Sequence, residues 1–322
     1  ANFAADVTFA DGADIITASA GTSNFRAGVN AGNSITSGGN YNVVVGDEAG
    51  TAITTGDDNV AIGYAALDAL SVGSRSVAIG SGALTALTAT GNAYNTAVGY
   101  LAGTAVTTGI RNNFFGAEAG EALTEGTDNI AIGYQTLTAD TKGSKSVAIG
   151  NNALDAQNFT SATDAYNVAI GQAAGSAVTT GTQNTLIGGL AGDALNTGTD
   201  NVVLGFGSLG SDTKGNKSTA LGRGTLVGQN FTSATDTYNT AVGYFAGNAV
   251  TTGTHNTFIG GLAADANTTG YYNVAVGASA LSANTTAISN TAVGYSALAA
   301  NTTGAAGTAV GKGALAANTT GN

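Results

Sequence analysis

A glycine recurs along this chain at an almost constant spacing, and this repeat limits what the chain can fold into. Of the fifteen intervals between successive copies, twelve are 17 residues long, one is 19 and two are 21. Seventeen residues are too few for a helix, a strand and their turns, so each repeat is expected to be one coil of a stacked β structure. These motif glycines are Gly46, Gly63, Gly80, Gly99, Gly116, Gly133, Gly150, Gly171, Gly188, Gly205, Gly222, Gly243, Gly260, Gly277, Gly294 and Gly311.

The residues just before each motif glycine, which is counted as position zero, predict a β-strand. Positions −1 and −2 are apolar in every coil, position −3 is usually Val or Thr, and position −4 is Asn in twelve coils. A short β-branched block between turn-forming residues is typical of a strand. A second short strand is expected after the glycine, where small residues at +3 and +6 would let the two backbones approach closely. Turns such as Thr107-Thr108-Gly109 close the coil, with glycine at both corners supplying positive φ.

The chain is therefore predicted to be all-β, a parallel β-roll or β-solenoid of about 16 coils with a 17-residue period. Regular coils are expected over residues 42–322 and a degenerate first coil over residues 24–41, so that 24–322 is the solenoid. Residues 1–23 are interpreted as an N-terminal cap or linking segment, with candidate cap strands at 7–9 and 15–17. At the spacing of paired strands, sixteen coils make a rod about 75 Å long. The last residues begin what would be another coil, which suggests a section of a longer polypeptide.

Two neighbouring apolar positions indicate a strand that is covered on both faces. Successive side chains of a strand point to opposite sides, so one face can pack inside its own coil while the other needs a cover. A threefold bundle of identical chains would bury the same stripe on each rod. The large residues at position −2, Phe114, Leu186 and Phe258, are expected to need this cover. The alternative is that alanine at position −2 is simply a tolerated exposed residue.

The blocks at residues 59–63, 146–150 and 167–171 resemble the head repeats of trimeric autotransporter adhesins, and similar repeats occur in bacteriophage tail fibres. The resemblance covers residues 42–322. It implies a left-handed β-roll with three chains side by side, an extracellular place on a virion or a bacterial cell, and a role in attachment. The period alone determines neither the handedness nor the number of chains.

Two nearly identical insertions, at residues 157–166 and 229–238, lie 72 residues apart, and a shorter relative occupies 85–94. The pairs Lys142/Lys145 and Lys214/Lys217 keep the same phase, so the bulges and lysines should lie along one edge, roughly 19 Å apart. Solenoid insertions often bind partners. The alternative is that they brace against a neighbouring chain with their phenylalanines buried. The candidate contact residues are Asn158, Phe159, Tyr166, Asn230, Phe231 and Tyr238.

Tyrosines that directly follow the motif glycine form a second candidate surface. Aromatic rings on a flat β face can stack on sugar rings, which would suit glycan attachment. The alternative is that these tyrosines only pack at the coil corners. The candidate glycan-stacking residues are Tyr64, Tyr100, Tyr134, Tyr244 and Tyr295.

Composition argues against catalysis and against nucleic-acid or membrane partners. The net charge is −11, there is no cysteine, and no apolar run approaches the ~18 residues of a membrane span. An acidic chain repels nucleic acids and anionic lipids. His255 is the only histidine, so one chain can build neither a histidine pair nor a Ser-His relay. We expect no catalytic residue, no metal and no cofactor.

Two local motifs are interpreted as incidental. The Gly-x-Gly-x-x-Gly match at 205–210 arises from the coil glycines and has no helix after it. Acidic corners at 57–58, 128–129 and 200–201 suggest calcium, but isolated acids on turns are more often solvated.

The leading functional hypothesis is a structural and adhesive fibre shaft, not an enzyme, which spaces or presents receptor-binding surfaces. Its expected partners are other copies of itself, in a homotrimer, with a cell-surface receptor or glycan as a further candidate. One alternative is an ice-binding or glycan-binding solenoid, suggested for ice by repeated Thr-Thr corners such as Thr54-Thr55. Another is an extracellular filament subunit without receptor binding. A polysaccharide-cleaving β-helix would need clustered carboxylates, and the acids here are scattered.

Overall fold

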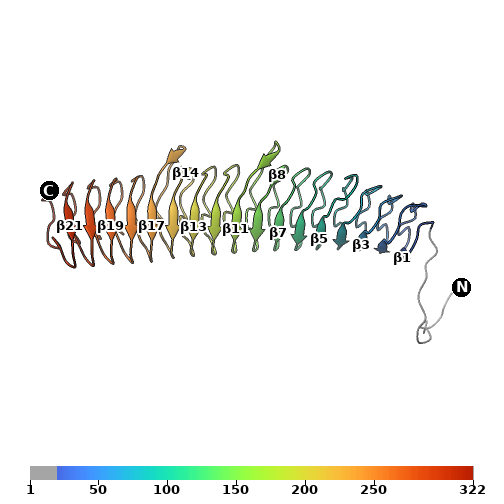
Figure 1. Cartoon of the computed structure of the whole chain (residues 1–322), viewed down its shortest axis with the longest axis horizontal. Coiled ribbons are helices and arrows are strands. Elements are labelled where there is room, and N and C mark those ends of the chain that lie inside the picture. The colour runs from blue at the N-terminus through green and yellow to red at the C-terminus, as the bar shows by residue number, and fades with distance from the viewer. Residues whose placement is uncertain (1–19, 322) are drawn as a thin grey trace, which may run out of the picture.

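The computed structural model describes residues 20–321 and shows one long β-solenoid (Figure 1). Each coil contributes a three-residue strand to a sheet of 17 strands. The strands of this main sheet are β1 (Phe25–Ala27), β2 (Val43–Val45), β3 (Val60–Ile62), β4 (Val77–Ile79), β5 (Thr96–Val98), β6 (Asn113–Phe115), β7 (Ile130–Ile132), β9 (Val147–Ile149), β11 (Val168–Ile170), β12 (Thr185–Ile187), β13 (Val202–Leu204), β15 (Thr219–Leu221), β17 (Thr240–Val242), β18 (Thr257–Ile259), β19 (Val274–Val276), β20 (Thr291–Val293) and β21 (Thr308–Val310).

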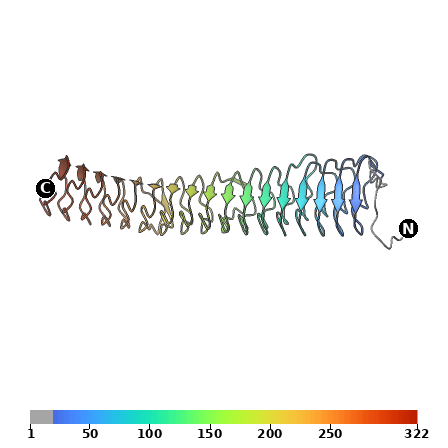
Figure 2. The same ribbon diagram turned by 90° about the horizontal axis from the view of Figure 1, so that it is seen from below.

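All neighbouring strands of the main sheet are parallel and keep one register. Phe25 pairs with Val43, and Val43 in turn pairs with Val60, so every motif glycine lies beside the next one. The degenerate repeat forms β1 and stacks on β2, which brings the solenoid to 17 coils. The strands change their tilt gradually along the rod, so the sheet twists (Figure 2). The candidate cap strands at 7–9 and 15–17 lie outside the described residues.

The interior of each coil is built from one strand position, −2, and three turn positions, +3, +4 and +7. Position −2 points inward, and Phe114, Leu186 and Phe258 are completely buried within their own chain. The expectation that these three need a second chain to cover them is therefore wrong. Positions −3 and −1 instead form the outer face of the sheet, where β6 and β13 keep only their central residue buried.

Small residues at +3 complete this interior as expected, whereas those at +6 do not. Ala66 and Ala102 at +3 are fully buried, but Ala69 and Ala105 at +6 are half-buried at the surface. A further interior position is +7, which the pattern did not reveal. It changes from aliphatic residues such as Leu70 to polar ones in the insertions and the C-terminal coils, and Asn284 there donates to the Asn267 side chain at 2.8 Å.

The second element of the coil is a series of turns, not the expected strand. Residues at +2 and +4 adopt left-handed φ, as at Ala65 (51°) and Leu67 (52°). Bonds to the next coil still hold these turns, for example from the Leu67 N–H to the Ala83 carbonyl at 3.1 Å. Position −5 is left-handed as well, from Tyr41 to Ala306.

The motif glycine is required by both backbone conformation and space. Gly260 has φ +136°, and a Cβ there would lie 2.6 Å from the backbone of Gly277. The closing glycine Gly109 differs from expectation, since its φ is not in the left-handed region. Its Cβ would nevertheless lie 2.4 Å from the Gly126 carbonyl. Close stacking of coils, rather than turn geometry, explains this second glycine.

The asparagine at −4 is a buried ladder rather than a turn residue. The Asn42 side chain donates to the Gly56 carbonyl at 2.8 Å and accepts from the Asn59 backbone N–H at 3.0 Å. The same pair of bonds repeats along the rod, for instance from Asn184 to Gly198 and from the Asn201 N–H to Asn184. Each amide thus joins one coil to the next and leaves few buried polar groups unpaired.

Where interior position −2 carries Phe or Leu, interior position +4 of the same coil carries glycine or alanine. Phe114 fills the space beside Gly103 and Gly120, where an added Cβ would lie within 2.8 Å and 2.3 Å of its ring. In the next coil the sizes are reversed, with Ala131 at −2 and a buried Leu137 at +4. A phenylalanine at −2 and a leucine at +4 do not occur in the same coil, as close packing demands.

We expect Gly260→Ala to lower the free energy of unfolding by at least about 2 kcal/mol, through backbone strain and the clash with the next coil. Gly261→Ala is the matched control, because a Cβ there meets nothing within 4 Å. It should change the stability by less than about 0.5 kcal/mol. Urea denaturation followed by circular dichroism measures both; equal effects of the two changes would contradict the stacking role.

Phe114→Ala should cost about 3–5 kcal/mol of stability because it opens a cavity in the interior. Adding Gly120→Leu restores the Ala131–Leu137 arrangement and should recover part of that loss, less the cost of left-handed φ at leucine. Denaturant unfolding of the single and double variants forms a double-mutant cycle. Strictly additive losses would argue against the exchange of volume between the two positions.

Candidate binding surfaces

Because the strands are parallel and in register, each repeat position forms a row along the rod. Two exposed rows border the outer face of the main sheet. We call position +1, just after the strands, the aromatic row, and position −5, just before them, the corner row. The two insertions leave the coil at the corner row.

The aromatic row contains all five predicted glycan-stacking tyrosines. Their exposed fractions range from 47% to 60%, so each tyrosine is about half open to solvent. From Tyr64 to Tyr134 the aromatic residues occupy alternate coils, about 9.6 Å apart, with Ser81 and Ala117 between them. The exposed Phe206 also belongs to this row, although the sequence prediction, which considered only tyrosines, did not include it. The predicted residues are Tyr64, Tyr100, Tyr134, Tyr244 and Tyr295.

The two long insertions project from the same side of the rod (Figure 1). One pairs β8 (Gly143–Ser144) with β10 (Thr163–Asp164), and the other pairs β14 (Gly215–Asn216) with β16 (Thr235–Asp236). Asn158 and Asn230 are exposed, so of the predicted contact residues these two asparagines are open to a partner.

The phenylalanines of the insertions are buried in their own chain. Phe159 and Phe231 are only 6% and 7% exposed. They fix the loops to the shaft without a neighbouring chain to brace against, and they offer almost no side-chain surface to a partner.

A buried carboxylate holds each loop at its base. Asp140 accepts hydrogen bonds from the backbone N–H groups of Gly143 (3.0 Å) and Phe159 (3.1 Å) and from the Gln157 amide (2.6 Å). Burial raises the pKa of the Asp140 carboxyl, while the bonds from Gln157 and the backbone oppose the shift. Asp212 repeats the arrangement with Gly215, Phe231 and Gln229.

The glutamine of each loop also joins the ladder at −4. Gln157 donates to the Ser146 hydroxyl at 3.1 Å and accepts from the Asn167 amide at 2.8 Å. The serine that replaces asparagine before an insertion therefore makes room for the glutamine. This exchange was visible in the sequence, but its structural reason was not.

Tyr166 and Tyr238 lie in the corner row rather than at the loop tips, and each is about half exposed. Lys145 lies 5.0 Å from the centre of the Tyr166 ring and 2.5 Å from Asp164. Those two partners raise the pKa of Lys145, which keeps the lysine charged. Lys217, Tyr238 and Asp236 repeat this cluster. Cation, acid and ring thus form one surface unit beside each loop.

The remaining candidate residues take part in ordinary surface contacts. The His255 ring lies between Tyr238 and Tyr272, with ring centres 5.1 Å and 4.9 Å away. The acidic corners at Asp58 and Asp128 pair with arginines of neighbouring coils.

Metal-binding clusters and membrane-spanning helices are both absent from residues 20–321. No group of three or more His, Cys, Asp or Glu side chains in this range could hold a metal ion. Nor does this range contain a helix long and apolar enough to cross a membrane.

Asp140→Asn should alter the pH dependence of stability. A raised pKa in the folded state means that the carboxyl contributes stability below about pH 4, its unfolded pKa, and loses it as pH rises through the raised value. The variant has no such proton to lose. Its free energy of unfolding, relative to the unmodified chain, should therefore rise with pH across this window.

The same variant should be less stable at low pH by about 1–3 kcal/mol, since one buried donor loses its acceptor. Urea unfolding at a series of pH values measures both effects, with the exposed Asp200→Asn as control. A difference from the unmodified chain that stays constant with pH would contradict the buried-carboxyl explanation.

Comparison of the chain with protein-family models, with curated proteins and with solved structures finds no match.

Proposed function

We propose that this chain is a segment of a rigid extracellular fibre, built from identical chains side by side, that presents binding surfaces on a virion or a bacterial cell. The observation that carries the proposal is the apolar row at position −1. It runs along the outer face of the main sheet through all 17 coils except β1, which carries Ala27 there. Leu204 and Phe115 in this row are 50% and 41% exposed.

A continuous apolar stripe of this length is unusual on a monomer, whose largest exposed patches are commonly a few hundred Å². A rotation axis parallel to the rod lets each copy lay the same face against its neighbours, and a closed ring leaves no stripe uncovered. Three copies are the number that the resemblance to adhesin heads implies. The need for a cover now rests on positions −3 and −1, not on position −2.

Attachment, rather than spacing alone, is supported by what remains outside this face. The loops project from one edge, and the aromatic row leaves rings open along the other. Neither feature is required for coils to stack, since most coils lack both. The alternative is a filament subunit without receptor binding. An assembled rod that binds no ligand would favour this alternative.

The ice-binding alternative is weakened by the threonine corners. The first threonine of each pair donates its hydroxyl to the next coil, as Thr107 does to the Thr124 carbonyl at 3.2 Å and Thr302 to the Thr319 carbonyl at 3.1 Å. These hydroxyls serve the stack and are not free to order water on a flat surface.

In solution the chain should have about three times its mass of 31.0 kDa, in an elongated particle. Ile170→Asp with Leu204→Asp places charge in the outer apolar row and should give a folded monomer, because an unpaired buried charge is costly. Analytical ultracentrifugation and circular dichroism measure mass and folding.

Thr180→Asp with Thr252→Asp is the matched control, since both threonines are exposed on the closing turn, away from the outer face. This pair should leave the assembly intact. An unmodified chain that sediments as a well-ordered monomer of 31.0 kDa would overturn the proposed shaft.

A further inference from the structure

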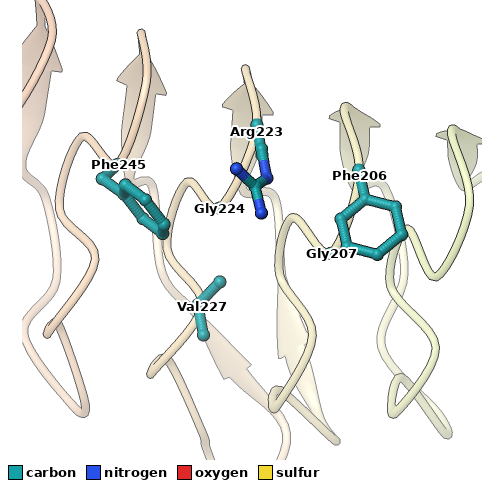
Figure 3. A pocket seen from close by; sticks show the side chains of 6 residues that line it. All are labelled: Phe206, Gly207, Arg223, Gly224, Val227 and Phe245. Carbon is teal, nitrogen blue, oxygen red and sulfur yellow. The ribbon is translucent and has the colours of Figure 1, made fainter.

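The aromatic row is interrupted by one hollow, which lies directly after the ends of β13, β15 and β17. It has a volume of about 140 Å³ and extends over three successive coils (Figure 3). Phe206 and Phe245 stand at its two ends, with the Arg223 side chain between them. The lining residues are Phe206, Gly207, Arg223, Gly224, Val227 and Phe245.

Glycine at +2 in two successive coils creates the hollow. Gly207 and Gly224 have φ of 59° and 66°, and neither has a side chain that could fill the space between successive coils. A Cβ on Gly224 would lie 2.4 Å from the Phe245 ring, so that ring occupies space that only glycine leaves. At the equivalent position other coils carry larger residues such as Glu118 and Gln135.

Arg223 provides a positive charge with no acidic partner in the described part of the chain. Its guanidinium lies 5.8 Å from the centre of the Phe206 ring, which orients it, and no carboxylate of residues 20–321 is within ion-pair distance. Five other basic side chains do pair with acids: Arg75, Arg111, Lys142, Lys145 and Lys217. On a chain of net charge −11, this free guanidinium marks a local preference for an anion.

We propose that the hollow is a binding subsite for a carboxylate-bearing sugar ring of an acidic polysaccharide. The planar guanidinium can donate two parallel hydrogen bonds to a carboxylate. The apolar faces of Phe206 and Phe245 can pack against the C–H face of the same ring. This inference rests on the attachment role proposed above and names the chemical class of its ligand.

The size and position of the hollow fit one ring of a longer chain. Pockets that enclose whole ligands measure about 300–1,000 Å³, well above the hollow. Tyr244 follows at once in the aromatic row, with its ring centre 4.4 Å from that of Phe245, so it can support the next ring of the polymer. The anion is selected by Arg223 alone, because the overall field of an acidic rod would repel it.

The test compares tetragalacturonate with its fully methyl-esterified form, which has the same rings without the charge. Isothermal titration calorimetry on the full chain should show binding of the acid and at least about tenfold weaker binding of the ester. Arg223→Gln should weaken the binding of tetragalacturonate by a similar factor, whereas Arg223→Lys should retain part of the affinity. Phe206→Ala should weaken the binding of both the acid and the ester.

Tyr41→Ala is the matched control, because Tyr41 is an exposed tyrosine of the corner row, on the opposite edge of the main sheet from the hollow. It should leave binding of the tetramer unchanged. Equal affinity for acid and ester, or no effect of Arg223→Gln, would overturn the subsite, as would equal losses in Tyr41→Ala and Phe206→Ala. Absence of any binding would do so too.

The sedimentation measurement separates this inference from the proposed shaft. Elongated multi-chain particles that bind no acidic sugar would overturn the subsite and leave the shaft standing. Monomers that bind tetragalacturonate through Arg223 would overturn the shaft alone.

Discussion

The structure depends on the close approach of backbones at the motif glycine. At Gly260 the place of a Cβ is taken by the backbone of Gly277, so each coil lies directly on the next with nothing between them. This contact aligns the strands in one register, and the register in turn places the asparagine amides in a buried ladder that joins successive coils. The backbone hydrogen bonds and the hydrogen bonds of the asparagine side chains then both join successive coils along the rod. A single side chain at this position would disturb the strand, the ladder and the interior layer together.

Register also explains how a simple chain forms distinct surfaces. Each repeat position becomes a line of side chains, so a change at one position alters one line and leaves the interior untouched. The apolar line at −1 is the surface for which we propose self-association. The aromatic row and the loops lie on opposite edges of that face and remain open to other partners. The exposed rows can therefore vary along a solenoid whose strand register does not change.

The period, the parallel strands and the small residues at +3 could be predicted because each depends on one repeat position. The inward side of the strand could not, because positions −1 and −2 are both apolar and only the turns determine which one faces in. Position +7 was missed because its residues change from Leu70 to Asn284 along the chain while remaining buried. The hollow at Arg223 was missed for a different reason. It arises from two glycines and two rings in separate coils, none of which is unusual by itself.

The buried network beneath each loop shows how the shaft carries an extra segment without disturbance. Asp140 and Gln157 replace the ordinary interior residues at +7 of two successive coils, and Ser146 replaces the asparagine at −4 between them. Asp212, Ser218 and Gln229 do so again four coils later. The shorter insertion lacks this set, and its buried Ser76 hydroxyl has no partner. Three substitutions in the coil interior are thus enough to hold each long insertion. A solenoid built in this way can carry a projection wherever its coils accept these three substitutions, because the strands on either side of the projection still pair in the common register.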